Sequence, residues 1–478
     1  MTRRTKIVCT LGPASTDPKV LARMIEAGMD VVRINFSHGT PEEHARRVET
    51  IRSLARAAGR TIGVLMDLQG PKIRIGKFEN GKTTLKVGAR FILDARCKLG
   101  DDERVGLDYV NLPKDVRAGD TLLLNDGLIV LAVVEVKGPQ IITVVEQGGV
   151  LSNNKGINRK GGGLTAPALT EKDMEDIRIA AELKADYLGV SFPRSGQDIE
   201  WARSLLTKAG GKALICSKIE RAEAIADLEQ IIDASDIIMV ARGDLAVEVG
   251  DAVIPALQKR MISMARAKSK VVITATQMME SMINSPIPTR AEVSDCANAV
   301  LDGTDAVMTS AETAAGQYPV ETVEAMARVC IEAEKADIAR HEQRRAVGET
   351  TRDVESAVGR AVMSTANYLP IRAIAALTQS GKTALLMSRN DSAVPIYALT
   401  PLVETRRRVT LFRGVYPVNF AVKSKDPEET LNFAEDELLK RGAVQNGDLI
   451  IITIGEPFGK AGGTNTMKIV RVGEHRKP

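Results

Sequence analysis

The chain has 478 residues, of which 44% are hydrophobic and 26% are charged, and its formal net charge is +4. This composition is typical of a globular protein with room for about three domains of roughly 150 residues each. The small net charge implies neither a nucleic-acid nor a membrane partner, and no apolar run approaches the ~18 residues that a membrane-spanning helix needs.

Strand-like apolar segments alternate with helical patterns through much of the chain. These segments are short and rich in β-branched residues, and they lie at 5–12, 31–36, 61–68, 187–192, 212–220, 236–245, 270–279 and 306–313. Eight such units predict a (β/α)8 TIM barrel. An open doubly wound sheet is the alternative, because the alternation by itself does not exclude it.

The alternation is interrupted at 71–167, where short alternating runs are separated by Gly, Asn and Asp turns. This pattern predicts an inserted all-β lid domain after the third barrel strand. From about residue 346 a new α/β pattern begins. We therefore expect a catalytic barrel formed by 1–70 and 168–345, the lid at 71–167, and a C-terminal α/β regulatory domain at 346–478.

The cysteines and histidines do not form a recognisable metal or redox site. The five cysteines are scattered, with no CxxC pair, at Cys9, Cys97, Cys216, Cys296 and Cys330. An odd, dispersed set is typical of reduced thiols, so we expect a cytoplasmic protein. Among the four histidines, His38 and His44 are interpreted as helix-cap or surface residues, and acid–base work by imidazole is not expected.

The ends of the predicted barrel strands carry polar groups. In a barrel, functional side chains gather at the carboxyl ends of the strands. One charged strand end is most simply a solvated loop residue, but several together predict a site. The residues are Arg33, Asn35, Asp67, Lys218, Glu220, Arg242, Asp244, Thr276, Ser310 and Glu312.

The residue types at these ends predict phosphoryl chemistry with a divalent metal. Glu220 and Asp244 offer hard oxygen ligands on adjacent strands, which suit Mg2+ or Mn2+ rather than zinc. Three cations, Arg33, Arg74 and Lys218, are expected to face that metal. They suit a phosphoryl group, whose transfer needs charge neutralisation and alignment more than covalent chemistry.

Six long segments, spread from the N-terminus to residue 308, share one resemblance. They are KIVCTLGPAS (6–15), VVRINFSHG (31–39), SKIERAE (217–223), MVARGDLAVE (239–248), ITATQMMESM (273–282) and PTRAEVSDCANAVLDGTDAVM (288–308). Together they resemble the pyruvate kinase family, and the resemblance extends to the inserted lid and the C-terminal domain. It implies a glycolytic enzyme that transfers the phosphoryl group of phosphoenolpyruvate to ADP, giving pyruvate and ATP, and it implies a homotetramer.

The resemblance implies roles for the residues at the strand ends. Glu220 and Asp244 match the carboxylates that bind Mg2+ or Mn2+. The backbone N–H groups of Gly243 and Asp244, with the Thr276 hydroxyl, match the groups that hold the substrate carboxylate. Lys218 matches the lysine that contacts the phosphoryl group during its transfer and then contacts the enolate oxygen.

The resemblance also implies how the phosphates are bound. Arg33, Arg74 and, from the lid, Lys155 match residues that hold the nucleotide and the transferred phosphate. Asn35 and His38 complete the nucleotide-binding set that we expect.

Three further positions are implied by the same resemblance. Asp126 is expected on the lid face that closes over the site. Water ordered by Thr276 and Ser310 is expected to protonate the enolpyruvate carbon. Thr309 stands where the family has an apolar residue, and we expect little consequence from it.

The segment DLQGPKIR (67–74) departs from the common family pattern at a charged position. Most pyruvate kinases bind K+ through residues that match Asn35, Ser37, Asp67 and the carbonyl of Leu68. Those enzymes read D-T-K-G-P-E here, with a glutamate in place of Lys72. A subset carries the DLQGPK pattern and works without monovalent cations. We therefore expect the Lys72 ammonium to lie near Asp67 and replace K+, with a solvated loop lysine as the alternative.

The C-terminal segment TQSGKTALL (378–386) contains GKT but is not a P-loop, because the required earlier glycine is Ala376. A turn of small residues that opens a helix still makes an anion nest of backbone N–H groups. In pyruvate kinases the matching loop binds a phosphate of the allosteric effector, here expected to be a phosphorylated sugar or AMP. The expected effector residues are Ser380, Gly381, Lys382 and Thr383. A plain helix cap is the alternative, and GEPFGKAGGTNT (455–466) resembles the effector loop of the same domain.

The sequence therefore predicts a three-domain pyruvate kinase. Two other functions stay open at this point. One is a Mg2+-dependent pyruvate-enolate lyase on a similar barrel, which would share Glu220 and Asp244 but would need no nucleotide. The other is a non-enzymatic metabolite sensor built on an inactive barrel.

Overall fold

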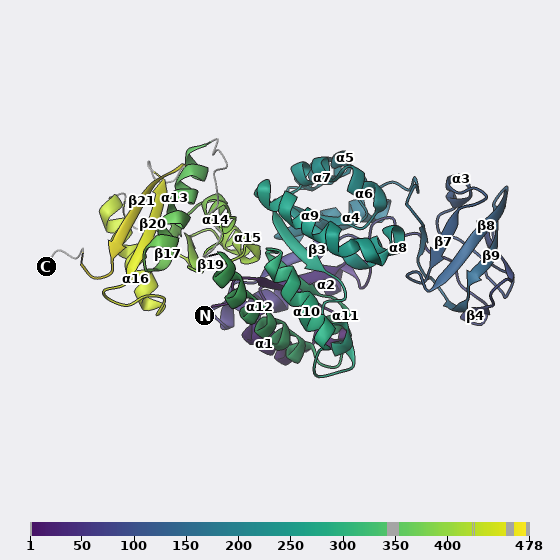
Figure 1. Ribbon diagram of the computed structural model, residues 1–478, viewed down its shortest axis with the longest axis horizontal. Coiled ribbons are helices and arrows are strands. Elements are labelled where there is room, and N and C mark those ends of the chain that lie inside the picture. Colours follow the sequence, from purple (N-terminus) through teal and green to yellow (C-terminus); the bar gives the residue numbers. More distant parts are fainter. Residues whose placement is uncertain (1, 342–352, 423, 425, 456–462, 475–478) are drawn as a thin grey trace.

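The computed structural model of the chain describes residues 2–341, 353–422, 424, 426–455 and 463–474. Three units follow one another along the long axis of the molecule (Figure 1). The barrel is in the middle, the inserted lid lies at one end and the C-terminal domain at the other. The N-terminus lies on the side of the barrel nearer to the C-terminal domain.

The central unit is a closed barrel of eight parallel strands, which rules out the open doubly wound sheet. The strands are β1 (Lys6–Thr10), β2 (Val31–Asn35), β3 (Gly63–Asp67), β12 (Tyr187–Val190), β13 (Leu214–Ile219), β14 (Ile237–Ala241), β15 (Val271–Ala275) and β16 (Ala306–Thr309). Almost all of their residues are buried, as expected of parallel strands covered by helices on the outside. The carboxyl ends of the strands consequently meet on one face.

Helices cover the outside of the barrel. They are α1 (Pro18–Ala27), α2 (Pro41–Ala57), α4 (Glu171–Glu182), α5 (Gly196–Lys208), α6 (Ala222–Ala226), α7 (Leu228–Ala234), α8 (Arg242–Val249), α9 (Ile254–Ala267), α10 (Arg290–Leu301), α11 (Ala311–Ala314) and α12 (Pro319–His341). Several begin with a reciprocal capping box, such as Thr40 with Glu43 and Thr289 with Glu292. The caps fix where each loop becomes a helix, and so how far each strand-end loop reaches over the site.

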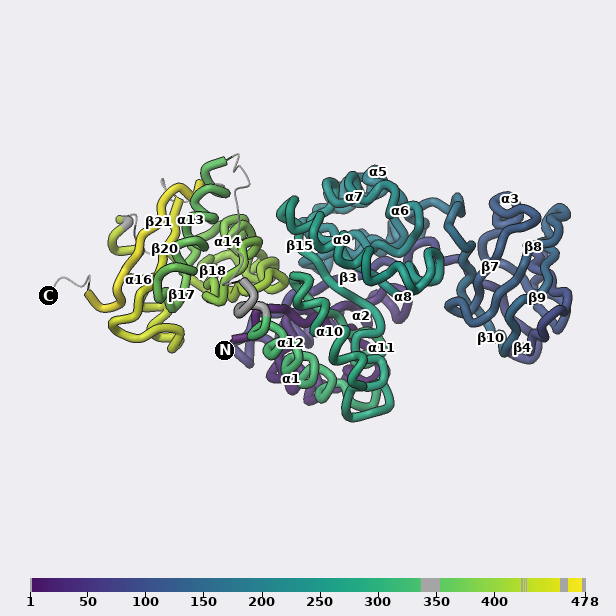
Figure 2. Tube along the Cα trace, viewed as in Figure 1, coloured from purple at the N-terminus to yellow at the C-terminus, as the bar shows by residue number. Residues whose placement is uncertain are grey.

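The lid is built from strands that pair antiparallel, except for one short parallel pair formed by 92–93 and 104–105. They are β4 (Lys82–Leu85), β5 (Arg90–Asp94), β6 (Arg104–Val105), β7 (Thr121–Leu124), β8 (Ile129–Lys137), β9 (Gln140–Gln147), β10 (Gly149–Ser152) and β11 (Ile157–Arg159), with the short helix α3 (Leu112–Asp115). Six of the strands form a sheet in the order β11-β7-β8-β9-β5-β6, and β10 pairs with β4. The trace in Figure 2 shows that the lid joins the barrel through two neighbouring connections beside α8.

The C-terminal domain is a five-stranded sheet with helices. Its elements are α13 (Val354–Tyr368), β17 (Ile371–Leu377), α14 (Lys382–Ser388), β18 (Ile396–Thr400), α15 (Val403–Arg408), β19 (Val415–Asn419), α16 (Pro427–Lys440), β20 (Leu449–Gly455) and β21 (Thr464–Arg471). The strand order is β19-β18-β17-β20-β21, and β21 runs antiparallel to β20. The α/β pattern expected from the sequence is therefore present in this part of the chain.

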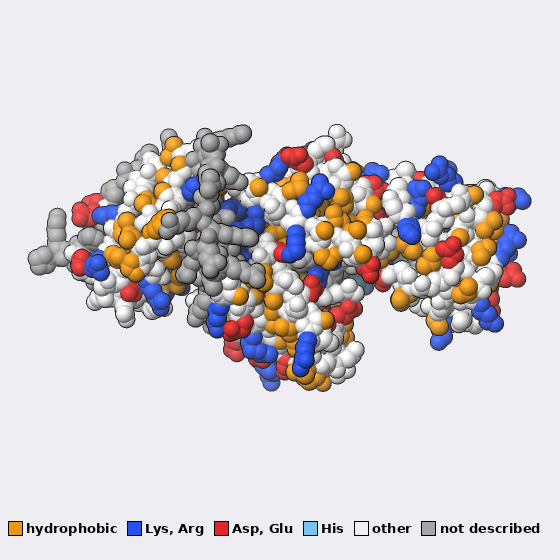
Figure 3. Space-filling model, viewed as in Figure 1, with side chains coloured by type: hydrophobic (Ala, Val, Ile, Leu, Met, Phe, Trp, Pro, Cys, Tyr) orange, Lys and Arg blue, Asp and Glu red, His pale blue; other side chains and the backbone are white. Residues whose placement is uncertain are grey.

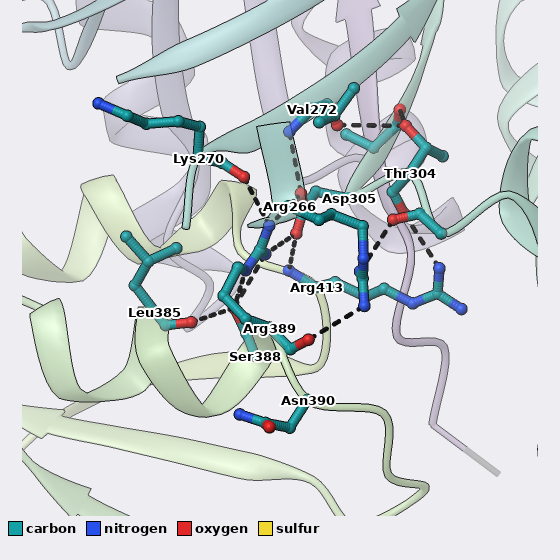
Figure 4. A network of polar contacts seen from close by, with 12 residues as sticks. Arg266, Lys270, Val272, Thr304, Asp305, Leu385, Ser388, Arg389, Asn390 and Arg413 are labelled. Atoms are coloured by element: carbon teal, nitrogen blue, oxygen red, sulfur yellow. Dashed lines mark hydrogen bonds and ion pairs between the residues drawn. The ribbon is translucent and has the colours of Figure 1, made fainter. Parts of the chain in front are cut away.

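A buried ion pair joins the barrel to the C-terminal domain. Asp305 directly precedes β16, and its carboxylate accepts hydrogen bonds from both terminal nitrogens of Arg389 (Figure 4). Arg389 Nη1 lies 2.9 Å from Asp305 Oδ2. The same carboxylate accepts the backbone N–H groups of Val272, at 2.9 Å, and Arg413, at 3.2 Å. Because Arg389 follows the last turn of α14, this helix is fixed directly to the start of a barrel strand.

The surface of the molecule is mixed in charge. Figure 3 shows lysine, arginine and acidic side chains interspersed over the visible face, in agreement with the small net charge. Within the described part of the chain, none of the helices combines the length and the apolar character required to cross a bilayer.

Candidate active site at the carboxyl ends of the barrel strands

Asp67, the last residue of β3, is a buried carboxylate that holds two cations. Its Oδ2 lies 2.5 Å from Arg33 Nη2 and 3.3 Å from Lys218 Nζ. Burial acts to raise the pKa of Asp67, but the charges of Lys218 and Arg33 overcome it and hold the pKa below its usual value. Asp67 is therefore ionised, and it fixes both cations at the mouth of the barrel.

Lys218, near the end of β13, is held by three oxygens. Its Nζ lies 2.9 Å from Glu220 Oε1 and donates to the Ser191 hydroxyl at 2.7 Å, in addition to its pair with Asp67. Burial acts to lower the pKa of Lys218, but the charges of Asp67 and Glu220 raise it above the usual value. These contacts therefore favour the charged form of Lys218 and fix the direction of its ammonium group. Ser191 was not identified from the sequence, although it follows an apolar strand segment as the other site residues do.

Glu220 and Asp244 form a pair of carboxylates that suits a divalent cation. Burial raises the pKa of Glu220, the Lys218 ammonium opposes this rise, and the negative charges of Asp244 and Asp67 add to it. Such mutual repulsion is what a divalent cation between the two carboxylates would relieve. The described residues contain no group of three or more potential metal-ligating side chains.

The end of β15 has a strained backbone that presents a hydroxyl to α8. Thr276 and Gln277 have φ of 70° and 54°, a region that residues other than glycine rarely adopt, and β-branched residues such as Thr276 least of all. The Thr276 Oγ1 accepts the backbone N–H of Gly243 at 2.8 Å. One of the N–H groups expected to hold a substrate carboxylate is thus bound to Thr276 in this structure.

Arg242 holds this strained segment in place. Its guanidinium donates to the carbonyl of Thr276 at 2.7 Å and to the carbonyl of Ala275 at 3.3 Å, and it pairs with Asp295 at 2.7 Å. The sequence placed Arg242 at a strand end without a role. The structure assigns it the role of fixing Thr276.

Ser310 and Glu312 follow β16, as expected. The Glu312 carboxylate accepts the backbone N–H groups of Ser310, at 2.6 Å, and Met279, at 3.2 Å, so it ties together the ends of two strands. The neighbouring Thr309 is buried, and its hydroxyl lies 2.9 Å from that of Thr313. Its polar group therefore has a buried partner in α11.

Thr10, at the end of β1, also belongs to the site. Its hydroxyl donates to the carbonyl of Thr309 at 2.8 Å and accepts from Arg33 Nη1 at 3.1 Å. Arg33 is thus oriented by both Asp67 and Thr10. The sequence interpretation missed Thr10, because a threonine in a short apolar strand carries no distinctive signal.

The structure places Lys72 differently from the expectation. Its Nζ lies 2.8 Å from Asp244 Oδ1 and 4.0 Å from Asp126 Oδ1, whereas Asp67 is paired with Arg33 and Lys218. The expectation that Lys72 lies beside Asp67 is therefore corrected. The reason is that the chain turns after Gly70, which has φ of 66°, and runs toward the lid over α8.

The oxygens that match K+ ligands mostly have internal partners. Asn35 Oδ1 accepts the backbone N–H of Ser37 at 3.0 Å, and the carbonyl of Leu68 accepts the Ser191 hydroxyl at 2.7 Å. Asp67 Oδ2 is used by the two cations. Asp67 Oδ1 is buried and has no hydrogen-bond partner among the described residues. Only part of a K+ site is thus open.

The other expected nucleotide-binding residues lie on the lid side or on the surface. The Arg74 guanidinium donates to the carbonyl of Asn154 at 3.0 Å, and the carbonyl of Lys155 accepts the N–H of Ile75 at 2.9 Å. Both cations are thus part of the lid rather than of the strand-end cluster. His38 is exposed in the turn after β2.

His44 is neither a cap nor a surface residue. It lies in α2, is 1% exposed, and packs edge-on against Phe36 with ring centroids 4.9 Å apart. Burial lowers its pKa. It is a core histidine, because the buried face of α2 includes its position.

The expected effector loop uses much of its own hydrogen-bonding capacity. The N–H of Gly381 donates to Thr378 Oγ1 at 2.9 Å, and that of Lys382 to Ser380 Oγ at 3.3 Å. The Lys382 ammonium lies 2.6 Å from Glu355 Oε2. The buried hydroxyl of Thr383 lies 2.6 Å from that of Thr464. Residues 456–462 of the second expected effector segment lie outside the described residues.

Comparisons with known proteins agree over most of the chain. The family model described as pyruvate kinase, barrel domain, matches residues 2–323, and that described as pyruvate kinase, alpha/beta domain, matches residues 356–470. A protein named pyruvate kinase from Buchnera aphidicola subsp. Baizongia pistaciae is 52% identical over 476 residues, which is 98% of this chain and 99% of that protein. Pyruvate kinase II from Salmonella typhimurium is 51% identical over 479 residues, again 98% and 99%. A pyruvate kinase from Geobacillus stearothermophilus is 43% identical over 98% of this chain and 80% of its own length.

Proposed function

The chain belongs to the pyruvate kinase family, and on that premise we propose how its site residues move the phosphoryl group of phosphoenolpyruvate to ADP. The observation that carries the proposal is the position of Lys218, a buried ammonium between the carboxylates of Asp67 and Glu220. A cation that is fixed before reaction stabilises the negative charge that develops during transfer without reorganising. Lys218 accordingly meets the phosphoryl group first and the enolate oxygen afterwards.

Arginines align the phosphoryl group during transfer. Arg33 is oriented by Asp67 and Thr10, so its remaining donors can bind phosphate oxygens in one direction. Arg74 and Lys155 reach the nucleotide phosphates from the lid. A divalent cation held by Glu220 and Asp244 would supply charge neutralisation for the transfer.

The substrate carboxylate and the proton are handled at the ends of β14, β15 and β16. The N–H groups of Gly243 and Asp244 lie in the first turn of α8. Backbone N–H groups in a first turn have no hydrogen-bond partner within the helix, so they can bind an anion. In this structure the Gly243 N–H donates to the Thr276 hydroxyl at 2.8 Å. With substrate bound, this N–H would be shared between the hydroxyl and the substrate carboxylate. Thr276 and Ser310 then order the water that protonates the enolpyruvate carbon.

A turnover assay separates this function from the two alternatives. We expect pyruvate and ATP to form in equal amounts from phosphoenolpyruvate and ADP in the presence of Mg2+. A pyruvate-enolate lyase would form pyruvate without ADP, and a metabolite sensor would not turn over. Either of those results would contradict the proposal.

Independence from K+ is a second part of the proposal. Lys72 brings a fixed positive charge to Asp244 and Asp126, at the entrance to the phosphoryl path. At about 4 Å and an effective dielectric between 20 and 80, one such charge is worth roughly 1–4 kcal/mol, enough to decide activity.

Assays in choline or tetramethylammonium salts test this part. The unmodified enzyme should be close to fully active without Na+ or K+, and Lys72→Glu should be weak until K+ is added. Lys77→Glu, an exposed lysine of the same segment, is the matched control and should behave as the unmodified enzyme. Strong activation of the unmodified enzyme by K+ would contradict the role of Lys72.

Activation by a phosphorylated metabolite is a third part. Lys382 is 54% exposed at its side chain and stands beside the exposed Ser380, so a phosphate from solvent can reach both. The phosphate would have to draw the ammonium away from Glu355. A phosphorylated sugar or AMP bound there would act on the barrel through α14 and Arg389.

A panel of hexose monophosphates, pentose monophosphates and AMP tests the third part. At least one should lower the KM for phosphoenolpyruvate, and Lys382→Ala should abolish that response while basal kcat stays unchanged. Lys440→Ala, an exposed lysine of the same domain, is the control. An unchanged response in Lys382→Ala would place the effector elsewhere.

The quaternary state and the location complete the proposal. By resemblance to the family we infer a homotetramer in the cytoplasm. All five cysteines are free thiols, and four of them are buried, which suits a reducing compartment. Sedimentation at assay concentration should give a particle of four chains, and a monomeric particle would contradict the inference.

A further inference from the structure

Helix α8 connects the substrate site to the lid. It lies at the edge of the barrel from which the lid projects (Figure 2). Asp244 and Glu248 are four residues apart on it, so their side chains share one face. Asp244 contacts Lys72, on the segment that leads from β3 into the lid. Glu248 contacts the segment that leads out of the lid. Both lid connections are thus bound to one short helix.

The Glu248 carboxylate is buried and shared by two segments. Glu248 is only 5% exposed. Oε1 accepts the side-chain amide of Asn158, in β11, at 3.2 Å, and Oε2 accepts the N–H of Ala222 at 2.9 Å. The backbone carbonyl of Glu248 accepts the N–H of Gly161 at 3.0 Å. Ala222 is two residues after Glu220, so the carboxylate links the lid to the loop that carries a proposed metal ligand.

The segment that follows β11 has the geometry of a hinge. Gly161, Gly162 and Gly163 have φ of 82°, 78° and 92°, which only glycine adopts without strain. The N–H of Gly163 donates to Glu223 Oε1, so the barrel end of the segment is anchored. A Cβ on Gly162 would lie 2.7 Å from Glu223 Oε2. Lid rotation about these glycines is therefore opposed by the contacts on either side of them, those of Asn158 and Gly161 with Glu248 and that of Gly163 with Glu223.

We propose that Glu248 is a positioning residue that sets the angle of the lid, by holding Asn158 of β11 against α8. This goes beyond the proposed site roles and rests on them in one respect, namely that Arg74 and Lys155 bind the nucleotide from the lid. A lid held at the correct angle brings these cations over the site before ADP arrives. Preorganisation of this kind lowers the cost of binding the nucleotide, whereas the proposed ligands of the phosphoenolpyruvate carboxylate, Gly243, Asp244 and Thr276, lie on the barrel and do not depend on the lid angle.

Kinetics of three single variants and one double variant test the proposal. The buffer contains saturating K+, so that the outcome is independent of the role of Lys72. Asn158→Ala removes the side-chain amide that donates to Glu248 Oε1. We expect its KM for ADP to rise about tenfold, with kcat within about threefold and the KM for phosphoenolpyruvate within about twofold. Asn153→Ala is the matched control, because its side chain accepts the N–H of Phe78 inside the lid. It should leave the KM for ADP unchanged.

The third variant is Glu248→Gln, which keeps the shape of the side chain but offers only one acceptor oxygen for two donors. It should raise the KM for ADP as Asn158→Ala does. For the KM for ADP, the double variant should be no worse than Asn158→Ala alone, because Asn158→Ala already removes the contact that Glu248→Gln weakens. If Glu248→Gln fails to fold, Asn158→Ala alone decides the question.

A label on the lid gives a readout that a purely structural role would not move. Cys97 lies in the lid and is the one cysteine of the five that is not buried, so a thiol-reactive fluorophore should attach there. In Asn158→Ala the fluorescence anisotropy should decay further on the nanosecond scale than in Asn153→Ala. Equal anisotropy decays together with an unchanged KM for ADP would overturn the proposal. Loss of turnover in the unmodified enzyme would instead refute the proposed function.

Discussion

The Lys72 ammonium lies 2.8 Å from Asp244 Oδ1, although the two residues are 172 positions apart in the chain. Both side chains are 23% exposed, so the pair is shielded from much of the solvent. It joins the first segment of the lid to the helix that carries one of the two proposed metal ligands. A cation that binds Asp244 therefore meets a positive charge already in place.

This pair predicts that Lys72 weakens metal binding in the absence of substrate. Lys72→Met removes an ammonium that competes for the Asp244 carboxylate, so the Kd for Mn2+ should fall about five- to tenfold, which corresponds to roughly 1 kcal/mol. Titration of the enzyme with Mn2+ and detection of free Mn2+ by electron spin resonance measures it. Lys77→Met should leave the Kd unchanged. A weaker Mn2+ affinity in Lys72→Met would show that Lys72 supports the site instead of opposing it.

Lys218→Met should damage catalysis far more than binding. The ammonium is fixed between Asp67 and Glu220, so its charge matters most when negative charge develops in the transition state. We expect kcat to fall by about 10³ or more while the KM for phosphoenolpyruvate changes little. Steady-state kinetics separate the two. A large rise in KM with unchanged kcat would mean that Lys218 only binds the ground-state substrate.

Arg389→Met should destabilise the junction between the barrel and the C-terminal domain. The change leaves the fully buried carboxylate of Asp305 without its guanidinium, and breaking such a pair costs about 3–5 kcal/mol. Thermal unfolding followed by circular dichroism should show a midpoint lower by several degrees. Arg178→Met is the control, because its pair with Glu175 is 3.0 Å long but exposed. Its effect should be under about 1 kcal/mol, and equal effects would contradict the assignment.

Asp186 predicts a dependence of stability on pH. Burial raises its pKa to about 6, against the opposing charge of Arg407, and its Oδ2 accepts the N–H of Val64 at 2.9 Å. The unfolded chain has a pKa of about 3.9 at this group. Between these values the folded protein holds a proton that the unfolded chain has lost. The contribution of Asp186 to stability is therefore fully present below about pH 4 and is lost as pH rises through 6.

Asp186→Asn removes this dependence, because an amide does not ionise. The difference in melting temperature, variant minus unmodified enzyme, should grow from pH 4 to pH 7 and then level off. A pKa raised from about 3.9 to about 6 corresponds to a difference of roughly 3 kcal/mol in the free energy of unfolding at the plateau. Melting curves at several pH values measure it. A difference that is constant over this range would mean that Asp186 ionises normally in the folded protein.

The barrel and the polar residues at the ends of its strands could be predicted because both depend on local sequence patterns. Each strand is a short apolar run followed by a segment with helical periodicity. This pattern can be recognised in the sequence without knowing which strands lie next to one another. The topology then places every carboxyl end on one face, which is why Lys218 and Glu220 could be assigned to a site with Asp67. Single threonines and serines, such as Thr10 and Ser191, carry too little local signal to be found this way.

Other features were decided by the tertiary structure alone. The sequence placed Lys72 beside Asp67, but the turn at Gly70 and the position of α8 bring it to Asp244. The sequence placed His44 at the surface, but the packing of α2 buries it against Phe36. In both cases the backbone segment was identified correctly. What a long side chain contacts depends on elements far away in the sequence, and a difference of one rotamer or one turn changes the partner. Local patterns therefore determine where a residue lies along the fold, and only the packed structure determines which charge it meets.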